Sequence, residues 1–158
     1  MSLFLKNLGF RTDNLKESLV PYVLLTLALL VGLVVFLKFG GHALSGEWRR
    51  LYGHGLQALV LVTALATIQE VFFRGYLVPV LKRRFASFFA VVVLDAFFFS
   101  AMHAVFATAS VLVPEAFLAG LFFAGVYYYY PNVYLASAVH TFLNLMLIPL
   151  CALAAMSC

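Results

Sequence analysis

The sequence predicts an all-α protein: a polytopic integral membrane bundle of about five transmembrane helices, with residues 1–158 forming a single transmembrane domain. Of the 158 residues, 65% are hydrophobic and only 10% are charged, and the mean hydropathy is +1.06. A soluble domain of this length has too small an interior to bury that much apolar surface. The apolar runs are also long enough for helices that cross a hydrocarbon core about 30 Å thick. Both observations place the chain in the membrane class.

The first two apolar runs predict spans at about 18–38 and 54–81. The first holds no charged residue before its last position, which leaves about 20 residues to cross the hydrocarbon core. The segment 38–52 has the composition of a loop, with Trp48 suited to the level of the lipid headgroups. The second run ends at three consecutive cations, which must meet water or lipid phosphate, and Glu70 falls near its middle.

Three further spans are predicted at about 86–108, 114–130 and 133–154. From residue 116 onward the chain contains no Asp, Glu, Lys or Arg. As one helix this part would be about twice as long as the bilayer is thick, so it must fold back on itself. Pro131 follows a run of four tyrosines. Because proline ends a preceding helix and tyrosine favours the membrane interface, we expect the turn there.

Basic residues near the ends of the spans predict the orientation in the membrane. Six lie on the side of the amino terminus and three on the other side, so the amino terminus is expected in the cytoplasm, in a bacterial-type cell inner membrane. The formal charge of +4 suits anionic lipid better than nucleic acid, and we expect no nucleic-acid partner. The six are Lys6, Arg11, Lys16, Lys82, Arg83 and Arg84, and the three are Lys38, Arg49 and Arg50.

Three short polar patterns lie within the apolar runs: Gln69-Glu70-x-x-x-Arg74, Phe99-x-x-x-His103 and His140-x-x-x-Asn144. An ionisable side chain inside a membrane segment is costly to bury and is usually functional and paired. Positions four apart share a helix face, so Glu70 can meet Arg74, and His140 can project with Asn144. Each pattern alone also fits a packing role, in which the charges neutralise each other or the histidine is buried and satisfied. One shared polar site, at similar depths in three spans, explains all of them together.

In this order and with these separations, the patterns resemble the motifs of the CAAX prenyl protease and bacteriocin-processing (CPBP, Abi-type) family of intramembrane glutamic proteases. The family motifs are Glu-Glu-x-x-x-Arg, Phe-x-x-x-His and His-x-x-x-Asn/Asp, and the likeness covers residues 66–147. The resemblance implies that a carboxylate and His103 activate a water molecule, while His140 and Asn144 bind the oxyanion of the tetrahedral intermediate. Peptide hydrolysis needs such a base beside a water and such donors aimed at the developing oxygen charge.

The chain departs from the family pattern at the first carboxylate of the motif, which is Gln69 here. An amide cannot accept a proton at neutral pH, so Glu70 remains as the catalytic carboxylate, with Arg74 holding it charged and fixing its rotamer. Three explanations are open: Glu70 acts as the base in a divergent active branch, the chain is a catalytically silent relative, or the glutamine was introduced to trap an inactive form. We favour the first, since every other motif position, including Phe99, is intact.

We therefore expect an intramembrane endopeptidase that cleaves a membrane-tethered or lipid-modified protein or peptide. The alternatives are a catalytically silent membrane binding or immunity protein of the same fold and a proton or ion carrier, because buried carboxylates and histidines also occur in transporters. Glu70, His103 and His140 also match a zinc set of two histidines and a glutamate, but the His-Glu-x-x-His helix of many zinc proteases is absent from the sequence. No metal and no cofactor is expected. The role of Asp95, about two turns before His103, is open.

Overall fold

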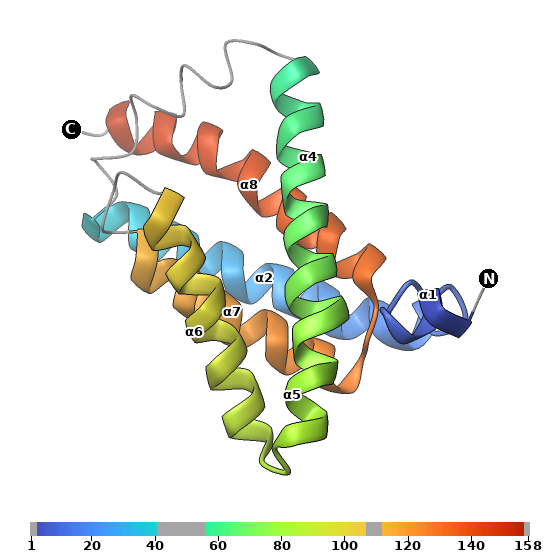
Figure 1. The fold of residues 1–158 in the computed structure, drawn as a ribbon. Coiled ribbons are helices and arrows are strands. Elements are labelled where there is room, and N and C mark those ends of the chain that lie inside the picture. Colours follow the sequence, from blue (N-terminus) through green and yellow to red (C-terminus); the bar gives the residue numbers. More distant parts are fainter. Residues whose placement is uncertain (1–2, 41–55, 107–111, 157–158) are drawn as a thin grey trace.

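Helices make up all the regular structure in the part of the chain that the computed structural model describes, residues 3–40, 56–106 and 112–156. No strand occurs in these residues, so the predicted all-α fold class is confirmed. Figure 1 shows the arrangement of the helices. In chain order they are α1 (Leu3–Asn7), α2 (Leu15–Gly40), α4 (Leu56–Glu70), the π-helix η2 (Val71–Leu77), α5 (Val78–Arg84), α6 (Phe88–Phe106), α7 (Leu112–Tyr129) and α8 (Val133–Met156).

Among the described residues, three helical stretches are long and apolar enough to cross a membrane: Leu15–Val35, Leu59–Arg84 and Phe88–Val105. A shorter apolar stretch covers Val133–Met146. The molecule is therefore a helical membrane bundle, as its composition predicts. The helices α7 and α8 begin and end close to the last two predicted spans, and that they also cross the membrane stays a prediction. Trp48 and the loop predicted around it lie outside the described residues.

The helices are arranged as one side-by-side pair, α6 with α7, and a group in which α8 crosses two other helices. α6 and α7 lie along each other, while α8 packs against both α4 and α2 (Figure 1). The contact of α6 with α7 is close because Gly120 has no side chain: a Cβ there would lie 2.9 Å from the Cα of Ala96. Such an approach of two backbones requires a small residue at the contact. The crossing of α4 with α8 brings the first polar pattern of the sequence close to the third.

The amino-terminal segment is fastened to the turn between α7 and α8. After α1 the chain turns at Gly9, whose φ of 81° is a conformation that residues with a Cβ rarely adopt. The Gly9 carbonyl accepts a hydrogen bond of 2.8 Å from the backbone N–H of Val133. The buried side chain of Asn132 donates to the Arg11 carbonyl at 2.8 Å and to Asn14 Oδ1 at 2.9 Å. The turn predicted after the tyrosine run is therefore confirmed, and it is tied to the start of the chain.

The π-helical segment η2 interrupts the long rod formed by α4 and α5. At its end the backbone N–H of Val78 donates to the carbonyl of Phe73, five residues earlier, whereas an α-helix has a spacing of four. Pro79 gives a physical reason, because it has no N–H to donate and its ring would collide with the carbonyl of Gly75 in a regular α-helix. The wider turn relieves this conflict. Segments of this kind are frequent at functional sites, and η2 begins directly after Glu70.

Candidate active site

The first polar pattern forms a buried cluster of charges that includes a residue from another helix. Glu70 Oε2 lies 3.3 Å from Arg74 Nε, and Asp95 Oδ2, on α6, lies 3.8 Å from the same nitrogen. All three side chains are fully buried. The pairing of Glu70 with Arg74 expected from their spacing is present, but Arg74 lies between two carboxylates. Charges can be buried in this way only because each has an opposite charge beside it.

His140 on α8 contacts the same cluster. Its Nδ1 lies 2.8 Å from Glu70 Oε1, in a hydrogen bond between side chains 70 residues apart. Because an ionised carboxylate only accepts hydrogen bonds, Nδ1 carries the proton when Glu70 is charged. The His140 ring is buried, with its centroid 5.8 Å from that of Phe99 and 5.7 Å from that of Phe123. Glu70 thus connects the first polar pattern with the third.

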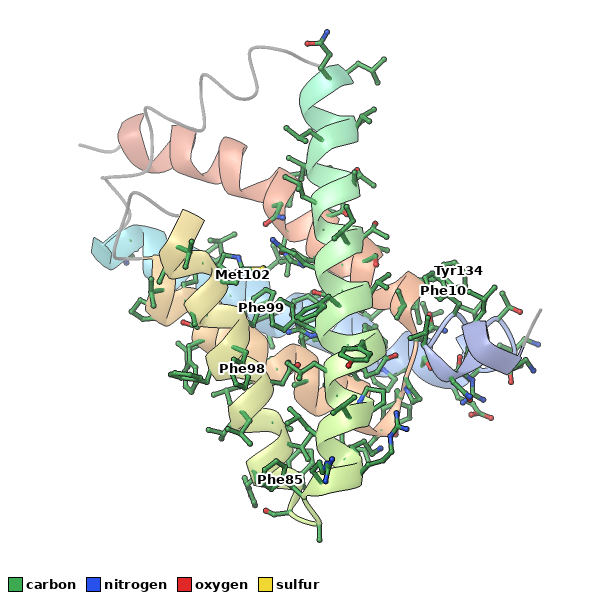
Figure 2. The ribbon with its side chains drawn as sticks, viewed as in Figure 1. Phe10, Phe85, Phe98, Phe99, Met102 and Tyr134 are labelled. Atoms are coloured by element: carbon green, nitrogen blue, oxygen red, sulfur yellow. The ribbon has the colours of Figure 1, made fainter. Side chains whose placement is uncertain are left out.

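Aromatic rings surround the guanidinium group of Arg74. Its Cζ lies 4.4 Å from the ring centroid of Phe99, 5.1 Å from that of Phe123 and 5.8 Å from that of Phe73, which are cation–π distances. Figure 2 shows Phe99 turned from α6 towards the rod of α4 and η2, whereas its neighbour Phe98 points away from it. The three guanidinium nitrogens have no aligned hydrogen-bond acceptor among the described residues. Charge and ring contacts therefore hold this side chain in place.

His103 lies one turn beyond Phe99 on α6 and is half-buried. Its Nδ1 lies 2.8 Å from the carbonyl oxygen of Phe99. Since a carbonyl oxygen only accepts, Nδ1 carries the proton, and Nε2 keeps its lone pair in the neutral ring. The ring centroids of His103 and Phe99 are 4.5 Å apart. The Phe99 ring therefore contacts both motif histidines, one from its own helix and one from α8.

The other two predicted site residues lie next to the cluster along the chain. Gln69 is half-buried in the last turn of α4, directly before Glu70. Asn144 is half-buried on α8, one turn after His140, and four residues bring it to the same face of the helix. Gln69 therefore borders the buried charges through its neighbour Glu70, and Asn144 lies one helical turn from His140.

The composition of the cluster determines what it can do chemically. It contains two carboxylates and one guanidinium, so an imidazolium at His140 would balance the charges when both carboxylates are ionised. Glu70 Oε2 is buried and has no hydrogen-bond partner among the described residues, so it can accept a proton or a hydrogen bond. Nε2 of His103, whose ring contacts Phe99, is a second proton acceptor. Hydrolysis by an activated water requires such an arrangement.

Sequence reasoning did not assign two members of the cluster. Asp95 is the only carboxylate in the predicted span 86–108, and the signal it carries is that an isolated charge in an apolar helix needs a buried partner. Which cation pairs with it does not follow from its position. Phe123 on α7 contacts both Arg74 and His140, but nothing in the sequence distinguishes it among 17 phenylalanines.

A protein-family model supplies the identification. The model described as type II CAAX prenyl endopeptidase Rce1-like matches residues 53–146, more than half of the chain. The chain belongs to the Rce1-like family. Searches among curated proteins and among solved structures returned no match.

Membership of the Rce1-like family confirms the resemblance inferred from the three motifs, all of which lie within the matched residues. The family is that of CAAX-type intramembrane proteases, so the chain is an integral membrane protein of a protease family. In general terms, the family implies a membrane-associated prenylated protein as substrate.

The Rce1-like chain has no evident grouping of metal ligands in the part that the structure describes. No three or more His, Cys, Asp or Glu side chains there are placed to hold a metal ion. Zinc needs its ligands within about 2.0–2.3 Å of one point. The predicted alternative set of Glu70, His103 and His140 does not form such a group.

Proposed function

We propose that this Rce1-like chain is an intramembrane endopeptidase of the glutamic type, which hydrolyses a peptide bond in a lipid-anchored or membrane-tethered protein tail. The observation that carries the proposal is the 2.8 Å contact between Glu70 Oε1 and His140 Nδ1. Separate packing roles for the motifs do not require these two side chains to meet, whereas a shared site does. Family membership supports the class of reaction.

Water activation is assigned to Glu70 and His103. The neutral His103 ring has an accepting lone pair at Nε2, because its Nδ1 is bonded to the Phe99 carbonyl at 2.8 Å. Glu70 contributes Oε2, which has no hydrogen-bond partner among the described residues. One of these acceptors takes a proton from water as the water oxygen attacks the scissile carbonyl carbon. The carbonyl π electrons move to its oxygen, which becomes the oxyanion.

Oxyanion stabilisation is assigned to His140 and Asn144. With Nδ1 of His140 bonded to Glu70, an imidazolium presents Nε2–H as a second donor, and the Asn144 amide adds another from the same helix face. Collapse of the tetrahedral intermediate breaks the C–N bond, and the proton taken from water passes to the leaving amine. The products are a carboxylate and a free amino terminus.

Arg74 and Asp95 act on this chemistry through their charges. Arg74 lies 3.3 Å from Glu70 and pairs with its carboxylate, and Asp95, 3.8 Å from Arg74, supplies a negative charge that balances an imidazolium at His140. Gln69 supplies no base. The site therefore relies on Glu70 alone where the family pattern has two carboxylates.

Cleavage of defined peptides by the reconstituted chain tests the proposal. Vesicles containing the full chain would be mixed with a farnesylated peptide tail and with the same peptide without the lipid, and products would be identified by mass spectrometry. Glu70→Gln and His103→Ala should each lower the rate by about 10²–10⁴-fold, the usual contribution of a positioned acid–base group. The matched control is Glu115→Gln, which neutralises a half-buried carboxylate on α7 outside the cluster and should leave the rate unchanged.

Retention of full activity in both Glu70→Gln and His103→Ala would contradict the assignment of the site. A catalytically silent binding protein is the second candidate, and Gln69 is the observation that favours it. That candidate predicts no product from the natural chain under any condition, together with saturable binding of the farnesylated peptide. Proton flux across the vesicle membrane without cleavage would instead indicate a carrier. From the distribution of basic residues we also propose a cytoplasmic amino terminus in a bacterial-type inner membrane.

A further inference from the structure

A hollow on the molecule lies outside the cluster of charges described above. It has a volume of about 330 Å³ and is formed by the amino-terminal segment, the end of the long rod and the turn between α7 and α8. Lys82, which lines it, lies eight residues beyond Arg74, which is about 12 Å along the helix. The lining residues are Lys6, Asn7, Arg11, Val78, Pro79, Lys82, Tyr127 and Pro131.

Three cations from two distant parts of the chain line this hollow. Lys82 Nζ donates a 2.9 Å hydrogen bond to the Tyr128 carbonyl and lies 3.9 Å from the centroid of the Tyr128 ring. Arg11 Nη2 lies 3.1 Å and Lys6 Nζ lies 3.7 Å from Asp13 Oδ2. The hydrogen bonds from Arg11 hold the pKa of the Asp13 carboxyl below its usual value, so it is charged at neutral pH. Three positive charges and one negative charge leave an excess of two.

The wall that carries Lys6 and Arg11 is held by hydrogen bonds to the rest of the molecule. The Asn14 side chain donates to the Pro131 carbonyl at 3.0 Å, and the Tyr127 hydroxyl donates to the Leu8 carbonyl at 3.3 Å. Two further hydrogen bonds join the same parts of the chain: Val133 N–H donates to the Gly9 carbonyl, and the Asn132 side chain donates to the Arg11 carbonyl. The backbone that carries the basic side chains is therefore positioned before any ligand arrives, which reduces the cost of binding.

The position of the hollow relative to the membrane helices restricts its ligand. The rod that carries Lys82 reaches the end of its apolar stretch at Arg84, and α6 begins its own at Phe88. Val78, Pro79 and Pro131 add apolar groups to the lining beside the cations. A ligand that fits both the cations and the apolar lining has an anionic phosphate next to an apolar group, as a phospholipid has at the level of its headgroup. Lys and Arg side chains supply several donors each to phosphate oxygens.

We propose that this hollow binds the phosphate group in the headgroup of an anionic phospholipid. Free inorganic phosphate has the same chemistry and is the other source that must be distinguished. Binding at this site does not require peptidase activity, so the test of this proposal is independent of the test of the function proposed above.

Native mass spectrometry of the full chain tests this. The chain would be released from vesicles of phosphatidylcholine with or without phosphatidylglycerol, at one fixed ionic strength, and bound lipids would be counted. Replacing Lys6, Arg11 and Lys82 with glutamine should weaken retention of phosphatidylglycerol about fivefold for each cation removed, in line with the usual effect of a basic residue at a membrane surface. The matched control is Arg83→Gln with Arg84→Gln, adjacent cations that do not line the hollow.

Selective loss in the triple variant, with retention kept in the control, supports the site, and circular dichroism would verify that both variants are folded. Equal loss in both indicates general attraction to a basic surface and overturns the proposal, as does unchanged retention in the triple variant. Displacement of phosphatidylglycerol by millimolar inorganic phosphate, but not by an equal ionic strength of chloride, would overturn the lipid as the source in favour of free phosphate.

Discussion

The buried contact between Arg74 and Asp95 predicts that substitutions of these two residues have coupled effects on the free energy of unfolding. Arg74 is fully buried and compensates both Glu70 and Asp95 at 3.3 Å and 3.8 Å. Arg74→Gln removes that compensation and should lower the free energy of unfolding by about 3–5 kcal/mol, the usual cost of removing one partner of a buried pair. Asp95→Asn alone should cost less, because Arg74 keeps Glu70 at 3.3 Å.

The double variant should be more stable than the sum of the two single losses predicts. At 3.8 Å and an effective dielectric constant of about 20, Coulomb's law gives about 4 kcal/mol for the attraction between the two charges. Part of this is offset in the folded protein by the desolvation of both groups. The coupling energy measured by the double-mutant cycle should therefore be about 1–3 kcal/mol. With Asp95→Asn, the charges of Glu70 and an imidazolium at His140 balance without Arg74.

The assay is reversible unfolding by a denaturant in detergent micelles, followed by circular dichroism for the natural chain, the two single variants and the double variant. The control combines Arg74→Gln with Glu115→Gln, which removes a half-buried carboxylate that forms no described ion pair with Arg74. It should show no coupling. Additive losses for Arg74 and Asp95, or coupling of equal size in the control, would refute the idea that these two charges compensate each other.

Three further predictions concern the site and the packing around it. Gln69→Glu restores the first carboxylate of the family motif and should raise the rate of peptide cleavage; a lower rate would show that a second carboxylate disturbs this cluster. His103→Gln keeps a polar side chain but removes the Nε2 base, so the turnover number should fall about 10²-fold or more while peptide binding stays nearly constant, and an equal change in binding would argue for a packing role. Gly120→Ala places a Cβ 2.9 Å from the Cα of Ala96 and should destabilise the fold by about 1–3 kcal/mol. At Gly32 an added Cβ would meet no neighbouring side chain or helix within 4 Å, so Gly32→Ala should stabilise the fold by about 0.5–1 kcal/mol. Equal effects of the two alanines in thermal unfolding would contradict the close contact of α6 with α7.

The local spacing of residues predicted much of the site. A separation of four along a helix was sufficient to predict that Arg74 meets Glu70, and the contact is present at 3.3 Å. The π-helical turns of η2 were not predictable from that rule, because they arise where Pro79 disturbs the hydrogen-bond ladder. The catalytic roles of the motif residues stay predictions until the variants are assayed.

The sequence by itself determined the membrane class, the helical segments, the turn at Pro131 and the family, because each depends on composition, on periodicity or on short motifs. Only the tertiary structure decided which helices cross. The crossing of α4 with α8 sets Glu70 2.8 Å from His140. The packing of the other elements pairs Asp95 with Arg74 and brings Lys6 and Arg11 to the same hollow as Lys82. The physical reason is that apolar helices present similar surfaces to one another, so the choice of neighbour depends on packing details such as the missing side chain at Gly120 and on rare buried polar contacts.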